Sequence, residues 1–187
     1  MSMRVRAAAL LIVVALFTAD VSFSAPLFQG LGVVGSNGSS YADSVSGDGL
    51  TVGGHGTGGV FRWTVAVGKE FVSTPPNFFF NEATGLSQDG SVVVGWADDE
   101  RIGAFPPTIQ RIGSPVETLW SLMRPDTSRT SLAAATDVSA DGSIVLGYGY
   151  STTRARSESF VYDQANGLRY ISDLSGATRS MVARAIS

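Results

Sequence analysis

Apolar residues in this chain come in short runs separated by turn-forming residues, and the runs have the length of β-strands. Val92-Val93-Val94 and Ile144-Val145-Leu146 are uninterrupted. A strand with one wet face alternates apolar and polar positions, whereas a strand covered on both faces is apolar throughout. The pattern therefore predicts short strands that lie between neighbouring sheets.

Each of these runs follows the same turn, Ser-x-Asp-Gly, which the chain contains three times with its Asp at 48, 89 and 141. Around each Asp the same residue types recur at fixed offsets, with Ala six before, Ser two before, Gly one after and Gly six after. The aligned residues are Ala42, Ala83 and Ala135; Ser46, Ser87 and Ser139; Gly49, Gly90 and Gly142; Gly54, Gly95 and Gly147. Such a turn fits a type I geometry closed by a left-handed Gly, which joins strands in hairpins. Spacings of 41 and 52 residues are typical of solenoids, propellers and arrays.

Further strands are predicted on either side of each hairpin. A third strand is expected at 59–65, 103–110 and 158–164, and a strand that precedes each unit at 26–34, 68–73, 116–122 and 167–174. Pro106 and Pro107 predict an edge or broken strand in the second unit, because proline cannot donate to a ladder. The longer second spacing predicts about eleven extra residues, placed in a loop around 98–115.

Four short strands in each repeat match a propeller blade. The closing segment 182–187 resembles the start of another unit, and its turn Asp would fall just beyond Ser187. We therefore predict an all-β, propeller-like array of four-stranded antiparallel repeats over residues 25–187, incomplete, with three full units and part of a fourth. An exposed edge strand would favour self-association, or pairing with another copy of the chain.

The N-terminus has the three parts of a secretory signal peptide. Arg4 and Arg6 precede the apolar run Ala7–Phe17, and small residues precede Ala25. We predict a signal peptide over residues 1–24, with a cut after Ala19 as the alternative, and a secreted, periplasmic or cell-surface protein. The apolar run is too short to span a bilayer, and no later stretch of the sequence is long enough, so we expect no transmembrane segment in the mature chain.

Charge and cysteine content narrow the classes of partner. Loss of residues 1–24 would leave 11 basic and 15 acidic side chains, without a Lys/Arg stripe, so nucleic acid is not an expected partner. The chain has no Cys, so its core depends on packing and strand pairing rather than disulfides.

The first unit resembles the repeat of the HAF extracellular repeat family of bacterial proteins. Residues 41–64, YADSVSGDGLTVGGHGTGGVFRWT, follow the family pattern Ala-x-x-(Val/Ile)-Ser-x-Asp-Gly-x-x-Val-Val-Gly, then Ala-Phe-Arg-Trp-Thr, and residues 27–40 resemble the segment that precedes it. The resemblance is good in the third unit and weak after Gly95 in the second. It implies export and a propeller-like array, and it implies no established activity.

Candidate catalytic chemistry is sparse. His55 is the only histidine and lies in GGHGTGG, which we interpret as a flexible, solvated loop rather than a general base, metal ligand or phosphate-binding loop. A Ser-His-Asp triad could use no other His, and no Gly-x-Ser-x-Gly elbow is present. We expect no catalytic, cofactor-binding or metal-binding residues and no cofactor.

Three other groups have a structural and a functional interpretation. Asp48, Asp89 and Asp141 are interpreted as turn residues rather than calcium ligands, since calcium needs several clustered oxygens. The acidic run 98–100 is interpreted as solvated rather than metal-binding. The block Phe78–Phe80 is interpreted as core or inter-blade packing, with a ligand-binding shelf as the alternative.

We therefore predict an exported, non-enzymatic β-repeat protein, a binding or surface-structural module whose ligand or surface partner is unknown. The alternative is a fragment of a propeller hydrolase or lyase whose catalytic blades are absent from this chain.

Overall fold

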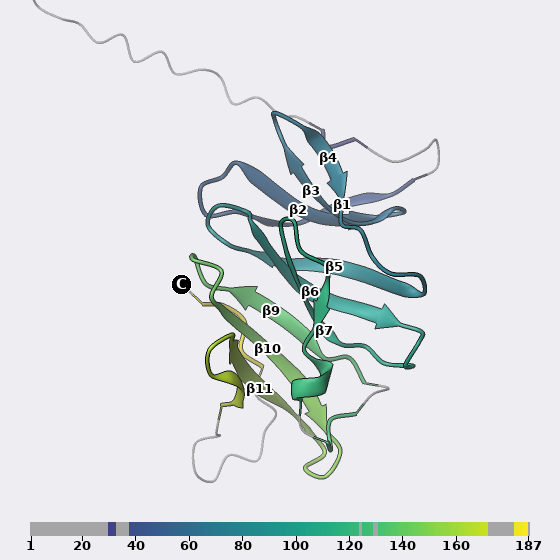
Figure 1. The fold of residues 1–187 in the computed structure, drawn as a ribbon, viewed down its shortest axis with the longest axis vertical. Coiled ribbons are helices and arrows are strands. Elements are labelled where there is room, and N and C mark those ends of the chain that lie inside the picture. The colour runs from purple at the N-terminus through teal and green to yellow at the C-terminus, as the bar shows by residue number, and fades with distance from the viewer. Residues whose placement is uncertain (1–29, 33–37, 124, 129–130, 172–181, 187) are drawn as a thin grey trace, which may run out of the picture. The chain divides into compact units, whose positions relative to one another are not determined.

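The computed structural model describes residues 30–32, 38–123, 125–128, 131–171 and 182–186, and the elements it contains are strands and one short 3-10 turn (Figure 1). The predicted signal peptide lies outside these residues. The elements are β1 Ser40–Val45, β2 Thr51–Gly56, β3 Gly59–Thr64, β4 Gly68–Phe71, β5 Phe78–Leu86, β6 Val92–Asp99, β7 Pro107–Arg111, β8 Glu117–Thr118, η1 Trp120–Leu122, β9 Ala134–Val138, β10 Ile144–Ser151, β11 Arg156–Asp163 and β12 Gly167–Tyr170.

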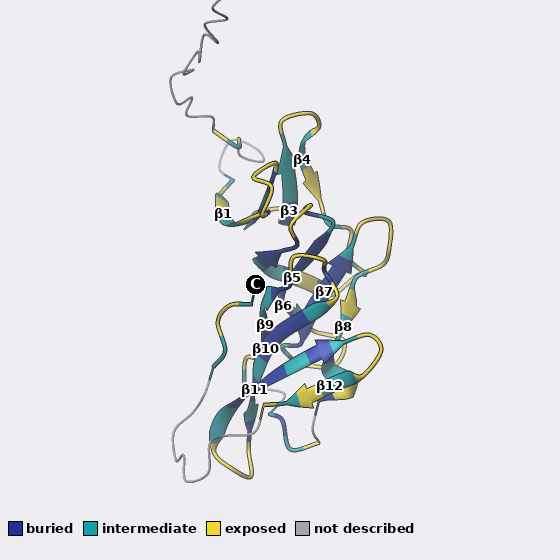
Figure 2. Cartoon of the chain, turned by 90° about the vertical axis from the view of Figure 1, so that its left-hand side faces the viewer, coloured by how far each residue is buried: buried dark blue, intermediate teal, exposed yellow. Residues whose placement is uncertain are grey.

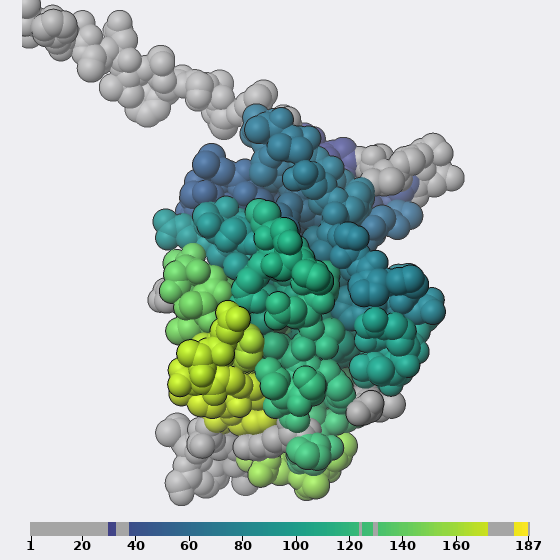
Figure 3. All heavy atoms as spheres, in the orientation of Figure 1, coloured from purple at the N-terminus to yellow at the C-terminus, as the bar shows by residue number. Residues whose placement is uncertain are grey.

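The strands form three four-stranded sheets, in each of which consecutive strands pair antiparallel. Sheet A contains β1–β4, sheet B contains β5–β8 and sheet C contains β9–β12. The first strand of each later sheet contacts the sheet before it, β5 against β1, β2 and β3, and β9 against β5, β6 and β7. Figure 3 shows the atoms of successive sheets in contact on one face. Successive meanders of this kind confirm the predicted propeller-like array.

Sheet B is covered on both faces, as the apolar run at 92–94 predicts. Val93 packs in a cluster with Phe80 and Val60, between sheets A and B. Its neighbours Val92 and Val94 pack in a second cluster with residues of sheet C. Figure 2 shows the burial concentrated where the sheets meet, while the outer strands β4 and β12 are intermediate or exposed.

The repeated Asp-Gly corner has one hydrogen-bonding scheme in all three sheets. In each copy the Asp Oδ1 accepts from the Ser hydroxyl and from the backbone N–H two residues later, and the Ser Oγ accepts from the N–H five residues later. In the second copy these distances are 2.8 Å from Ser87 Oγ, 2.9 Å from Ser91 N and 3.0 Å between Ser87 Oγ and Val92 N. The first and third copies repeat them within 0.2 Å. The turn Gly has a left-handed φ of 73°, 68° and 73°.

The second Gly of each repeat lies six residues after the turn Asp, at Gly54, Gly95 and Gly147, and it allows a bulge in the opposite strand. A Cβ on Gly95 would overlap the Glu82 carbonyl oxygen and press on the Phe80 ring, and Gly147 is enclosed in the same way by Ala134 and Phe160. The ladders between the first two strands shift register beside these glycines. A side chain there would force the two strands apart.

Three details of the predicted strands need correction. The strands at 68–73 and 167–174 form as β4 and β12 but pair with the preceding sheet, and the one at 116–122 shortens to β8 followed by η1. The candidate at 26–34 lies mostly outside the described residues. Strands β4, β8 and β12 are therefore the outer strands of sheets A, B and C, and each belongs to the unit before it rather than to the unit after it.

The proline-containing strand is not an edge strand. Strand β7 starts at Pro107 and pairs with both β6 and β8. Proline is tolerated because it is the first residue of the strand, and because Pro106 and Pro107 use their carbonyls to accept from Ala97 N–H and Leu119 N–H. The extra residues of the second unit lie mainly at 119–133, between β8 and β9, and only partly in the predicted loop.

The segment 182–186 lies against sheet C as the first strand of a unit lies against the sheet before it. Thr136 Oγ1 donates to the Ala183 carbonyl at 2.9 Å, as Thr84 Oγ1 donates to the Ala135 carbonyl at 2.6 Å. Ile186 N–H also donates to Asp137 Oδ2 at 2.8 Å. The sequence match between 182–187 and the earlier units therefore has a structural counterpart.

Candidate functional site

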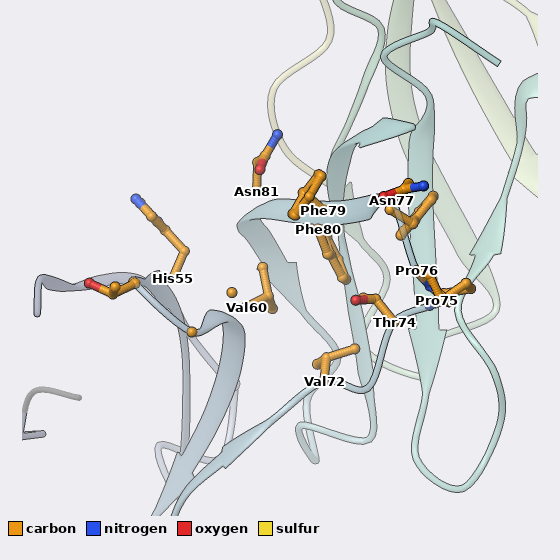
Figure 4. A pocket seen from close by; sticks show the side chains of 15 residues that line it. His55, Val60, Val72, Thr74, Pro75, Pro76, Asn77, Phe79, Phe80 and Asn81 are labelled. Carbon is orange, nitrogen blue, oxygen red and sulfur yellow. The ribbon is translucent and has the colours of Figure 1, made fainter. Parts of the chain in front are cut away.

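A cavity of about 460 Å³ lies where sheet A meets sheet B, and we call it the junction pocket (Figure 4). Two segments at the same end of the sheets form it, the β2–β3 hairpin and the connection that leads into β5. The lining residues are His55, Gly56, Thr57, Gly58, Gly59, Val60, Val72, Thr74, Pro75, Pro76, Asn77, Phe78, Phe79, Phe80 and Asn81. The lining contains no Asp, Glu, Lys or Arg, so the pocket is neutral apart from its one histidine.

His55 lies at the edge of this pocket, and its predicted place in a flexible, solvated loop is wrong. It belongs to strand β2, and the Gly-rich stretch around it forms the β2–β3 hairpin. Its Nδ1 lies 2.7 Å from Asp43 Oδ2, and its ring stacks on Tyr41 with the centroids 4.9 Å apart. About a third of its side chain is exposed. The missed signal is the repeat itself, because 51–56 aligns with the strand segments 92–97 and 144–149, and its glycines allow close strand approach instead of flexibility.

A second set of polar residues lies on the bulges of the first strands. Asp43, Thr84 and Thr136 occupy the same repeat position, and Arg184 occupies it in the segment 182–186; we call these four the inner row. Thr84 and Thr136 each donate to an Ala carbonyl of the following unit. At the first junction Ser44 makes the corresponding bond, to the Ala83 carbonyl at 2.8 Å. Asp43 accepts from Ala83 N–H at 3.3 Å, so at each of these junctions a residue of the inner row bonds to the following unit.

The inner row lines a second cavity, of about 430 Å³, together with Ala42 and Glu82. Glu82 is held by the indole of Trp96, whose Nε1 donates to its Oε2 at 2.9 Å. Burial raises the pKa of the nearby Tyr148, while Arg184 acts in the opposite direction. His55, Trp96 and Tyr148 each directly follow the second repeated Gly, so one position of the repeat supplies a different polar aromatic residue to each sheet.

A third and larger cavity, of about 790 Å³, lies beside the third Asp-Gly turn, and its charges are matched. Arg169 is paired with Asp163 at 2.9 Å, and Arg111 lies 3.8 Å from Glu117. Charges of both signs are present and paired, so the cavity does not select a charged ligand.

The aspartates of the repeat are held by their own turns, as predicted. Hydrogen bonds from Ser91 and Ser87 lower the pKa of Asp89 to about 2, and bonds from Ser139 and Ser143 lower that of Asp141 to about 2. Hydrogen bonds from Ser46 and Leu50 lower the pKa of Asp48. Each carboxylate already has its partners inside the turn, which is a structural role.

The residues of the acidic run 98–100 and of the block Phe78–Phe80 differ from one another in burial and contacts. The interpretation of the acidic run as solvated is wrong for Asp99, which is buried and forms a bidentate pair with Arg101, with both N···O distances at 2.7 Å. Phe78 and Phe80 are core residues, each 2% exposed, as predicted for the block. Phe79 between them is 51% exposed and faces the junction pocket, so the alternative of a ligand-binding shelf applies to this one residue.

In the part of the chain that the structure describes, no three His, Asp or Glu side chains are grouped to hold a metal ion. Within the same residues, none of the helical structure has the length and apolar content that crossing a bilayer requires.

No family model matches the chain, and no curated protein sequence matches it. Among solved structures, it is similar to a TolB-like protein from Agrobacterium tumefaciens, with 17% identity and a TM-score of 0.36 over 73% of this chain and 62% of that one. It is also similar to prolyl oligopeptidase B from Galerina marginata, solved with a 35-residue hydrolysis and macrocyclization substrate, with 13% identity and a TM-score of 0.45 over 68% of this chain and 20% of that one. The chain thus spans less than two thirds of either protein, and neither likeness transfers a function to it.

Proposed function

We propose that this protein is an exported, non-catalytic binding module whose ligand occupies the junction pocket. The observation that carries the proposal is the pocket itself, about 460 Å³ in volume and lined by apolar and uncharged polar groups in similar measure. Binding sites for small ligands have this size and combine apolar walls with polar groups that fix the orientation of the ligand. Export is supported by the N-terminal charge and apolar pattern, and membership of the HAF repeat family stays a prediction of the sequence.

The test is ligand-observed NMR of the full chain against a library of neutral small molecules, followed by protein-observed shifts. We expect hits whose shifts map to residues 55–60 and 72–81. The Phe79→Ala variant should lose these hits, because it removes the exposed wall of the pocket. Ile112→Ala is the matched control, since Ile112 is 63% exposed in the turn that follows β7, outside the pocket. Hits that map elsewhere, or that survive in Phe79→Ala, would contradict the proposal.

The hydrogen-bonded pair His55–Asp43 is the observation that favours the alternative function, an enzyme. A carboxylate bonded to one imidazole nitrogen orients the other nitrogen, which is the arrangement of a general base. A screen of hydrolase and lyase substrates with the wild type and His55→Gln therefore decides between the two functions. We expect no turnover in either protein; an activity present in the wild type and lost in His55→Gln would establish catalysis instead.

Self-association through an edge strand stays a prediction of the sequence, and size-exclusion chromatography of the full chain tests it. Concentration-dependent oligomers are the expected result.

A further inference from the structure

The start of strand β5 presents one aromatic ring to the junction pocket on a rigid support. Phe78 and Phe80 are buried on one face of the strand, and Phe79 points from the other face. The backbone is held by hydrogen bonds from Phe78 N–H to the Pro75 carbonyl and from Glu100 N–H to the Asn77 carbonyl, at 3.2 and 3.1 Å. The ring is therefore positioned before any ligand arrives, which lowers the entropic cost of binding.

Two asparagines lie on either side of this ring, and both have unusual backbone. Asn77 is left-handed, with a φ of 57°, and Asn81 is the extra residue where the β5–β6 register shifts between Phe80 and Glu82. Figure 4 shows Asn77, Phe79 and Asn81 along the same wall. Among the described residues, neither Asn side chain has a hydrogen-bond partner in the protein. Each amide can both donate and accept, which is what pairing with a hydroxyl group requires.

The chemistry of the wall selects among ligand classes. The face of an aromatic ring is negative, and it attracts the weakly positive C–H groups on one face of a pyranose. A charged ligand would lose hydration without gaining an ion pair, because the lining has no acidic side chain, no Lys and no Arg. A quaternary ammonium ligand needs several rings around it, and Phe79 is the one strongly exposed ring of this pocket among the described residues.

We infer that the junction pocket binds a neutral pyranose glycan, which stacks a sugar ring on Phe79 while Asn77 and Asn81 hydrogen-bond its hydroxyl groups. This inference rests on the proposed function and specifies its ligand class. The pocket volume accommodates a short segment of a chain rather than a whole polymer, so the glycan is expected to be bound at one or two sugar units.

The experiment titrates the full chain with neutral hexasaccharides of glucose in α-1,4, β-1,4 and β-1,3 linkage and of N-acetylglucosamine, to about 10 mM, followed by protein-observed NMR. We expect a millimolar to micromolar Kd for at least one of them, with shifts confined to residues 55–60 and 72–81. Phe79→Ala should weaken binding at least about tenfold, whereas Phe79→Trp and the control Ile112→Ala should bind at least as well as the wild type.

A change that keeps the backbone tests the hydrogen bonds separately. Asn81→Asp has the same shape but removes the amide donor and adds a charge, and we expect it to weaken glycan binding about tenfold without changing the melting temperature. Equal affinity in Asn81→Asp would remove Asn81 from the inferred site.

The outcomes separate the inference from the proposed function. If no hexasaccharide binds and a hydrophobic, uncharged peptide binds with loss in Phe79→Ala, the glycan inference is overturned and the binding module stands. If neither class of probe shifts residues 55–60 or 72–81, both fail.

Discussion

The second glycine of each repeat is the residue at which the fold is most sensitive to a single added carbon. Gly54, Gly95 and Gly147 each face a carbonyl of the opposite strand and an aromatic ring of the third or first strand of the same sheet. The bulges that place the inner row depend on this space. The spacing in the sequence identifies these three glycines, and the structure explains them by the close approach of the opposite strand's backbone.

Gly95→Ala is expected to destabilise the protein by about 2 to 3 kcal/mol, because the new Cβ overlaps the Glu82 carbonyl oxygen and backbone must move. Urea denaturation followed by circular dichroism measures the loss. Gly30→Ala is the control, as nothing lies within 4 Å of that position. A Gly95→Ala protein as stable as this control would contradict the close approach.

The turn aspartates make stability depend on pH in the acid range. The folded-state pKa of Asp89 and Asp141 is about 2, below the ordinary value of 3.8. As the pH falls, these carboxylates are therefore protonated in the unfolded chain before they are protonated in the folded protein. Their contribution is complete above about pH 5 and is lost as the pH falls from about 5 towards 2. We expect the double variant Asp89→Asn/Asp141→Asn to lose less stability than the wild type between pH 4 and pH 2.5.

Denaturation midpoints at a series of pH values check this expectation. Glu100→Gln serves as the control, because Glu100 is an exposed carboxylate outside the three Asp-Gly turns. Parallel pH profiles for the double variant and the wild type would show that the turn carboxylates are not responsible.

At the scale of the elements, both junctions between sheets contain an apolar cluster, and the junction between A and B adds a half-buried arginine. Between A and B, Arg62 of β3 donates from Nε to the Gly90 carbonyl at 3.1 Å, and from its terminal nitrogen to the carbonyls of Ser91 and Gln110. Its burial lowers the pKa to about 10, against the raising effect of Glu70, so the guanidinium stays charged at neutral pH. Between B and C, apolar side chains such as Ile109 fill the junction.

Arg62→Met should destabilise the protein by about 2 to 3 kcal/mol, because three carbonyls lose a charged donor while the apolar stem is kept. Chemical denaturation of Arg62→Met beside Arg169→Met measures it. Arg169 pairs with Asp163 at the surface, where an ion pair contributes less than about 1 kcal/mol. Similar losses in the two variants would mean that the inter-sheet bonds of Arg62 contribute little.

The threonines of the inner row give an isosteric test of the bond between sheets B and C. Thr84→Val keeps the shape but leaves the Ala135 carbonyl without its donor, and we expect a loss of about 1 to 2 kcal/mol. Thr118→Val, on the short outer strand β8, is the control. If the two substitutions have equal effects on the unfolding midpoint, the hydroxyl bond is not a connection between sheets.

At the scale of the whole array, sheet B has neighbours on both faces, and the outer strands do not. Its central strand β6 is buried from Val92 to Gly95, whereas β4 and β12 are intermediate or exposed along their length. Local opening costs least where few apolar contacts are broken. The array should therefore open from its outer strands inward.

Native-state hydrogen exchange tests this order. We expect the amides of β6 to exchange slowest, at the rate set by global unfolding, and those of β4 and β12 to exchange fastest. Equal protection in β4 and β6 would indicate one cooperative unit without a protected centre.

The local pattern of the chain determines its hairpins, because each part of that pattern acts over a few residues. The hydrogen bonds of the Ser-x-Asp-Gly turn form within the turn itself. The apolar run at 92–94 predicts a strand covered on both faces, without specifying which sheets cover it. Strand partners follow from longer-range geometry, so the sequence pattern predicts the wrong unit for β4 and β12 and the wrong position for β7.

The candidate site depends on contacts that no local pattern encodes. Three consecutive phenylalanines look alike in sequence, and strand pleating buries two and exposes Phe79. The Gly-rich sequence around His55 predicts a loop, whereas strand pairing and the bulge in β1 bring Asp43 to its imidazole. A pocket forms where segments distant in the chain meet, so its lining is decided by how the sheets pack and not by any stretch of residues alone.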